Sequence, residues 1–307
     1  MEGLREAPPR PCTTSHFRPR TVRVLDRYSR CERWSPPLIR TTVVSLVLLL
    51  LALTGLMFDD RVILGAPAML KPAKFAASGA VYLFTLAWMI RDLPKSRALR
   101  AAAAVIGWII VMETVLIFAQ AVRGLPSHFN VDTPLDIAIF SSMGFGIATV
   151  WVLSMLILIW HVRTPAADRA MATALRVGLA LNIVGAGVGW RMTQPSAAQI
   201  ASMSRSERPF VAGAHSVGGG DGEVGMPITH WSRHFGDLRI PHFLGMHALQ
   251  LLPLLLLGIR RVRQPRNDGA EHAFVLVTAA LCITVFGAAL IQALNGHPLI
   301  PPSSRTL

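Results

Sequence analysis

The sequence is poor in charge and in cysteine. Only 15% of its 307 residues are charged, 52% are hydrophobic, and the mean hydropathy is +0.47. An ordinary soluble domain is about 25% charged. Three cysteines are too few for an extensive disulfide framework, and neither CxxC nor the haem-attachment pattern CxxCH occurs. These shortages argue against a disulfide scaffold and a soluble domain, and they indicate a membrane protein.

Lysine is also scarce, with three lysines against 27 arginines. The net charge of +13 could indicate a nucleic-acid partner. However, the basic residues cluster in an N-terminal tail and in connections near 91–100, 162–170 and 260–271, where membrane topology accounts for them. We therefore expect a lipid bilayer, and no nucleic acid, as the partner of this chain.

Seven long apolar runs predict an all-α integral membrane protein with about seven transmembrane helices. The first run begins only near Thr41, so no cleavable signal peptide is evident. Residues 1–39 predict a basic, disordered tail, and residues 40–307 predict the transmembrane domain. The expected spans are 41–58, 72–90, 101–122, 134–160, 171–190, 241–257 and 272–294.

The basic residues also predict the orientation. Their excess lies in the tail and in the even-numbered connections, which places the N-terminus in the cytoplasm and the C-terminus outside. A long outer loop would then cover about 191–240. The glycines of SVGGGDGEVG in this loop predict flexibility, and the GxxxxGK[ST] phosphate-loop pattern is absent. Most of the conspicuous polar residues fall on this outer side.

Glu113 lies near the middle of the third span, where a carboxylate normally faces a cavity, a partner or the bundle interior. Gln120 and Arg123 follow on the same helical face. Lys74, at the start of the second span, could meet Glu113 or an anionic ligand, whereas Lys71 is expected to snorkel to headgroups. Glu113 and Lys74 are candidates for a proton relay, or for a pair that only locks helices together.

The stretch HWSRHFGDLRIPHFLGMHALQ, residues 230–250, is the densest polar segment. If its first residues form a helical turn, His230, His234 and Asp237 point to one side and could hold zinc, copper or iron. Asp237 could equally pair with Arg239. His242, in the first turn of the sixth span, is a further candidate ligand.

Cofactor binding within the membrane is predicted for His247 and Gln250, one to two turns inside the sixth span, together with His242. His128 follows the third span and could complete a transition-metal or haem site. The alternative for His247 is a neutral imidazole hydrogen-bonded inside the bundle. Gln120 and Arg123 would line the same site. In the sequence Thr-Pro-Leu-Asp that opens the fourth span, Thr133 resembles an N-cap before an N1 proline, and Asp136 is predicted to be a capping carboxylate.

The segments RGLPSHFN, GDLRIPHFLGMHALQ and QALNGHP resemble bacterial multi-pass membrane proteins that have no assigned activity. The resemblance covers the helical body and implies a multi-pass protein of the bacterial cytoplasmic (inner) membrane. It implies no activity, so whether the chain is an enzyme stays open. Three functions are carried forward: a membrane-embedded site for a metal or haem, a proton-coupled transporter, and an envelope assembly or structural protein.

Overall fold

The computed structural model describes residues 28–29, 31–205, 211–221, 223, 225–227, 229–263 and 267–300. Most of the predicted tail, residues 1–27 and 30, lies outside this part of the chain. The described end of the tail is helical from Pro36, so the prediction that disorder extends to residue 39 is wrong there. Pro36 takes the first helical position, where its missing N–H costs nothing.

Within the described residues, seven helices are long and apolar enough to cross a membrane, as the sequence predicts. In chain order they are α2 (Pro36–Phe58), α3 (Leu70–Met89), α4 (Arg97–Val122), α5 (Pro134–Arg163), α6 (Arg169–Met192), α8 (Arg239–Val262) and α9 (Asp268–Leu294). A 3₁₀ turn, η1 (Ile90–Asp92), extends α3, and α7 (Ala197–Ser204) is a short helix in the long loop. Four two-residue strands complete the described structure: β1 (Val62–Ile63), β2 (Ala66–Pro67), β3 (Ser216–Val217) and β4 (Gly236–Asp237).

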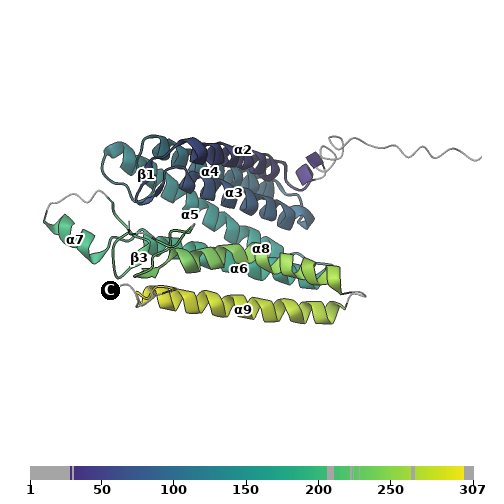
Figure 1. Ribbon diagram of the computed structural model, residues 1–307. Coiled ribbons are helices and arrows are strands. Elements are labelled where there is room, and N and C mark those ends of the chain that lie inside the picture. Colours follow the sequence, from purple (N-terminus) through teal and green to yellow (C-terminus); the bar gives the residue numbers. More distant parts are fainter. Residues whose placement is uncertain are drawn as a thin grey trace, which may run out of the picture.

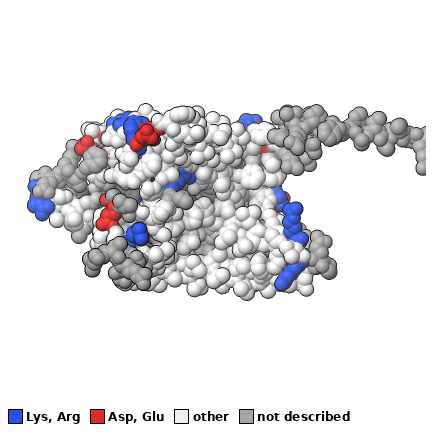
Figure 2. All heavy atoms as spheres, in the orientation of Figure 1, with Lys and Arg blue, Asp and Glu red and all other residues white. Residues whose placement is uncertain are grey.

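The surface has the pattern of a membrane protein. The charged residues of the visible face gather towards the two ends of the bundle, and most of the area between them is uncharged (Figure 2). Large apolar side chains such as Leu50, Phe145 and Leu254 are exposed on the helices. A soluble protein would bury such side chains, whereas lipid tails solvate them.

The seven helices form two groups of three joined by α5. Helices α2, α3 and α4 contact one another, as do α6, α8 and α9, and α5 contacts both α4 and α6 (Figure 1). Helices α3 and α8 make a smaller contact across the two groups. We call the boundary between the groups the seam.

Helices α6 and α8 are packed backbone to backbone. A Cβ atom added at Gly185 would lie 2.7 Å from the Cα atom of Gly245, so only glycine fits at this contact. Asn182 of α6 donates a hydrogen bond to the Met246 carbonyl at 2.8 Å, as expected for an amide inside a membrane bundle. The small residues of α6 therefore serve helix packing, in agreement with their spacing in the sequence.

The two ends of the bundle differ. At the end that carries α7 and β1 to β4, the long loop folds back over the bundle, and Ala212 donates a hydrogen bond to the Phe129 carbonyl at 2.8 Å. At the other end, Arg260 of α8 joins α6 and α9 through ion pairs to Asp168 (2.7 Å) and Glu271 (2.6 Å). The apolar core fills the bundle between the two ends. We call the first end the loop end and the second the arginine end.

Candidate functional site

Glu113 lies inside the bundle on α4, and its exposed fraction is only 2%. Neither carboxylate oxygen has a hydrogen-bond partner among the described residues. A buried carboxyl group without partners is costly, and it points either to protonation or to an interacting group that binds there. The prediction of a locked helix-to-helix ion pair therefore lacks support for Glu113.

The lysine associated with Glu113 is Lys71. The charges of Lys71 and Glu113 interact, and Lys71 is half-buried without a hydrogen bond or ion pair to a described residue. Lys74 is exposed, and its ammonium donates to the Thr229 carbonyl at 3.2 Å. The structure thus favours Lys71 over Lys74 as the lysine associated with Glu113. Lys71, which was expected to snorkel, turns to the interior, and Lys74 holds the long loop.

His128 lies in the connection between α4 and α5, surrounded by aromatic rings. Its ring centroid is 5.4 Å from that of Phe75 and 6.5 Å from that of Phe140. Its Nδ1 atom lies 3.1 Å from the Ser127 hydroxyl. Burial lowers the pKa of His128 well below the usual value of 6.5, and the charges of Lys71, His215 and His242 lower it further. The imidazole is therefore neutral at pH 7.

His215 enters the site from the long loop, next to β3. Its Nδ1 atom lies 2.7 Å from the Asp221 carboxylate, and its ring centroid is 5.1 Å from that of Phe129. Burial lowers the pKa of His215, and the hydrogen bond to Asp221 partly opposes this effect. Asp221 also accepts hydrogen bonds from the backbone N–H groups of His215 and Ser216, so the loop closes tightly around its carboxylate.

His242 occupies the first turn of α8. Its Nδ1 atom lies 2.8 Å from the Gly185 carbonyl of α6, within the glycine contact described above. Because a carbonyl oxygen only accepts, Nδ1 carries the proton and Nε2 has a free lone pair. The close approach of α6 and α8 thus fixes both the tautomer and the direction of this ring.

The three histidines have the same arrangement of partners. In each, Nδ1 is held by a side-chain or backbone oxygen, and no described residue forms a hydrogen bond with Nε2. Metal-ligating histidines are oriented by such an outer partner. The Nε2 atoms are not already gathered, since no three His, Cys, Asp or Glu side chains among the described residues are placed to hold a metal ion.

Gln120 and Arg123, predicted to bind a cofactor, contact Asp136 instead. Gln120 donates to Asp136 at 3.0 Å, and Arg123 forms an ion pair with it at 2.7 Å. The Thr133 hydroxyl accepts from the Asp136 N–H and also donates to its carboxylate, which confirms the predicted cap. This cluster joins α4 to α5. Each of its four side chains has a hydrogen-bond partner within the cluster, so none of them needs a cofactor as a partner.

The helical turn predicted over His230–Asp237 is wrong. The segment is irregular and ends in β4, and His234 is exposed. Asp237 is buried and bound by Arg239, whose guanidinium also donates to the His230 carbonyl. The alternative of an Asp237–Arg239 pair is therefore the one found. Metal binding by His230, His234 and Asp237 would need a different backbone from the one described.

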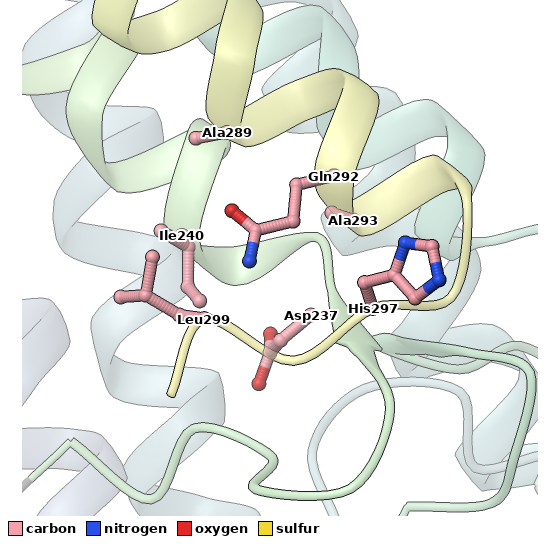
Figure 3. Close-up of a pocket in the computed structure, with 7 residues that line it drawn as sticks. All are labelled: Asp237, Ile240, Ala289, Gln292, Ala293, His297 and Leu299. Atoms are coloured by element: carbon pink, nitrogen blue, oxygen red, sulfur yellow. The ribbon is translucent and has the colours of Figure 1, made fainter. Parts of the chain in front are cut away.

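Figure 3 shows a shallow depression between α8 and α9 at the loop end, which is too small to enclose a water molecule. Asp237 and His297 line it, together with Gln292, whose amide donates to the Pro298 carbonyl at 2.7 Å. His247 lies deeper on α8 and packs against Phe243, with ring centroids 4.3 Å apart. The Gln250 side-chain oxygen is buried without a partner among the described residues. Cofactor binding by His247 and Gln250 stays a prediction.

His215 was missed at the level of sequence. The only local signal is Asp221 six residues later, within a glycine-rich segment that indicated flexibility. The structure instead places Lys71, His128, His215 and His242 near one another at the loop end of the seam, from α3, the α4–α5 connection, the long loop and α8. We call these four residues and Glu113 the seam site.

No family model matches the chain, and no curated protein or solved structure matches it. The function is therefore argued from the seam site alone.

Proposed function

We propose that this multi-pass membrane protein binds a transition-metal ion at the seam site through His128, His215 and His242. The observation that carries the proposal is the shared use of Nδ1, which leaves three imidazoles at one end of the bundle whose Nε2 atoms bond to no described residue. Three histidines with one open position are the ligand set of many catalytic zinc sites.

The residue types and their outer partners fit a metal ion. In the present conformation, however, the three rings are not placed to bind the same ion. Binding would need rotation about the side-chain torsions of His128 and His215, which lie in loops, towards the fixed ring of His242. A bound ion would supply Lewis acidity to a ligand or water. Glu113 would hold or release a proton beside it, and Lys71 would orient an anionic ligand.

The first test is metal analysis and an absorption spectrum of the detergent-purified protein, with Co²⁺ as a coloured probe. We expect close to one ion per chain, lost in His215→Ala and in His242→Ala. His234→Ala and His297→Ala are matched controls, because both rings are exposed and have no part in the seam site. Equal metal content in all five proteins would refute the proposal. A Soret band lost in His247→Ala would instead support the haem alternative.

A proton-coupled transporter is the second candidate, and the arrangement of the helices favours it. The seam site lies between two groups of three helices, where relative movement of the groups would expose it. In the present conformation Tyr82 of α3 and Ser154 of α5 share a hydrogen bond of 2.7 Å inside the bundle, which such a movement would break. Substrate-dependent proton flux in proteoliposomes would support transport. A Ser154→Cys variant that never reacts with a water-soluble thiol reagent would argue against it.

We also propose that the chain lies in the bacterial inner membrane with the arginine end in the cytoplasm. The ion pairs of Arg260 and the basic connections at this end support that orientation. A fluorescent protein fused after residue 307 should stay dark if the C-terminus is exported, and an alkaline phosphatase fusion there should be active.

A further inference from the structure

A second pocket, remote from the seam site, lies at the arginine end. Its volume is about 190 Å³, and it opens between the start of α2, η1 and the start of α4. Three basic side chains line it, Arg33, Lys95 and Arg100, and none of the described lining residues is acidic. The two nearest carboxylates in sequence are occupied, since Glu32 pairs with Arg40 and Asp92 pairs with Arg91. The described lining therefore has an excess of positive charge, which the nearby Asp92 carboxylate offsets only in part.

Two of the three cations of this pocket are held in place by backbone carbonyls. The Lys95 ammonium donates to the Trp34 carbonyl at 2.8 Å and to the Ile90 carbonyl at 3.2 Å. Arg100 donates to the Lys95 carbonyl at 2.6 Å. These contacts neutralise no charge, so they position the cations while leaving their attraction for an anion intact.

Ser35 gives an independent indication of a ligand. It lines the pocket and is only 6% exposed, yet its hydroxyl has no hydrogen-bond partner among the described residues. At the N-cap of α2 such a hydroxyl ordinarily accepts from the first turn, and here it does not. Because this hydroxyl reaches the surface of the pocket and donates to no described residue, it fits a bound oxyanion beside the three cations.

The surroundings of the pocket favour a lipid as the source of that anion. Arg91 stacks over Trp34 and Trp88, 5.8 and 5.6 Å from the ring centroids, and tryptophan is enriched where headgroups meet the hydrocarbon region. The apolar part of the wall is formed by Ile90, Leu99 and Ala103, together with Trp34 and Pro36. A phosphate with an attached acyl glycerol would satisfy both parts of the lining.

We propose that this pocket binds the phosphate of an anionic phospholipid headgroup, with Arg33, Lys95, Arg100 and Ser35 as its contacts. In the predicted orientation it faces the cytoplasmic leaflet, where anionic lipids attract basic residues. The pocket shares no residue with the seam site, so this assignment is independent of metal binding.

The test is native mass spectrometry of the full chain in detergent, titrated with phosphatidylglycerol and, separately, with phosphatidylcholine. We expect tighter binding of phosphatidylglycerol, weakened about tenfold or more in Lys95→Gln/Arg100→Gln, because each basic contact contributes about 1 kcal/mol. The control Arg97→Gln/Arg169→Gln removes the same charge at the same end from exposed residues outside the pocket. It should bind like the wild type.

Two further measurements complete the test. Arg33→Gln, which removes no hydrogen bond to a described residue, keeps the Lys95 contacts and should weaken binding even if the double variant folds poorly.

Inorganic phosphate and glycerol phosphate, added without lipid, identify the source of the anion. Their binding at this pocket with similar affinity would support the phosphate chemistry and assign a soluble ligand. Equal affinity of wild type and pocket variants for both lipids would overturn the proposal.

Discussion

Arg123 and Asp136 form an ion pair of 2.7 Å that joins the end of α4 to the start of α5. The Asp136 side chain is 1% exposed and that of Arg123 is 35% exposed, so water reaches only the cation. Gln120 and Thr133 complete the hydrogen bonds of the carboxylate. This cluster fixes the connection that carries His128, and it therefore supports the seam site without belonging to it.

Removing the Asp136 carboxylate should destabilise the bundle. Asp136→Ala leaves Gln120 and Arg123 without their acceptor, and we expect a loss of about 2 kcal/mol in the free energy of unfolding. Thermal unfolding in detergent, followed by circular dichroism, measures the change. Asp132→Ala, at an exposed carboxylate of the same connection, is the control and should unfold like the wild type. An unchanged midpoint in Asp136→Ala would contradict the structural role.

Glu113→Gln should leave the bundle as stable as the wild type, or more stable. The carboxylate has no hydrogen bond to lose among the described residues, and the amide removes the cost of a buried ionisable group. The same variant should weaken ligand binding or proton release at the seam site. If thermal unfolding instead shows a loss of about 3 kcal/mol or more, typical of a broken buried ion pair, Glu113 is a structural residue.

The stability of the protein should decline as the pH falls below about 6.5. The pKa of His128 is lowered in the folded state, so the unfolded state binds a proton first and acid favours unfolding. Above pH 6.5 both states are neutral at this residue and the effect vanishes. We expect His128→Gln to flatten the decline between pH 7 and pH 5 in thermal unfolding measurements. His234→Gln, at an exposed ring, should keep the wild-type slope.

Gly185→Ala should separate α6 from α8 and disturb the site at the same time. The added methyl group would lie 2.7 to 2.8 Å from backbone atoms of Gly245 and Met246. Overpacking of this kind costs about 1–3 kcal/mol. His242 should also lose its carbonyl partner, so metal or ligand affinity should fall. Gly258→Ala lies on α8 with no atom within 4 Å of the new methyl group, and we expect unchanged stability and affinity.

The sequence predicts the seven spans well because the physical cause is local. Each span is a continuous apolar run, and its length is set by the thickness of the membrane. The cap at Thr133 was predicted for the same reason, since Pro134 and Asp136 lie within one turn of it. The boundaries moved by several residues in places, as at the start of α2 (Pro36 rather than Thr41) and at the end of α8 (Val262 rather than Leu257).

The seam site was predicted only in part, because it depends on contacts between distant segments. His128 and His242 stood out by their positions near span ends. His215 did not, since its place is set by the long loop folding back on Phe129 and by the β3–β4 pairing. The choice between Lys71 and Lys74 depends on which face of α3 meets α4 and the α4–α5 connection. Helical periodicity places both lysines on one polar face and cannot make that choice.

The segment His230–Asp237 shows how a motif fails. The spacing HxxxH indicates a metal site only if the backbone is helical, and here Asp237 lies in a strand and binds Arg239. A short-range ion pair accounts for the conspicuous charges of this segment. The unpartnered groups of the seam site, which carry the functional proposal, lie elsewhere.

The glycine contact between α6 and α8 also determines when the seam site can exist. His242 is held by a carbonyl of α6, and His215 belongs to the loop that joins these two helices. Neither ring can take its place until α8 has docked against α6, after most of the chain has been inserted. A ligand of this site would therefore recognise only the fully assembled protein. Binding of such a ligand would stabilise the state in which α8 has docked against α6, which is reached last during assembly.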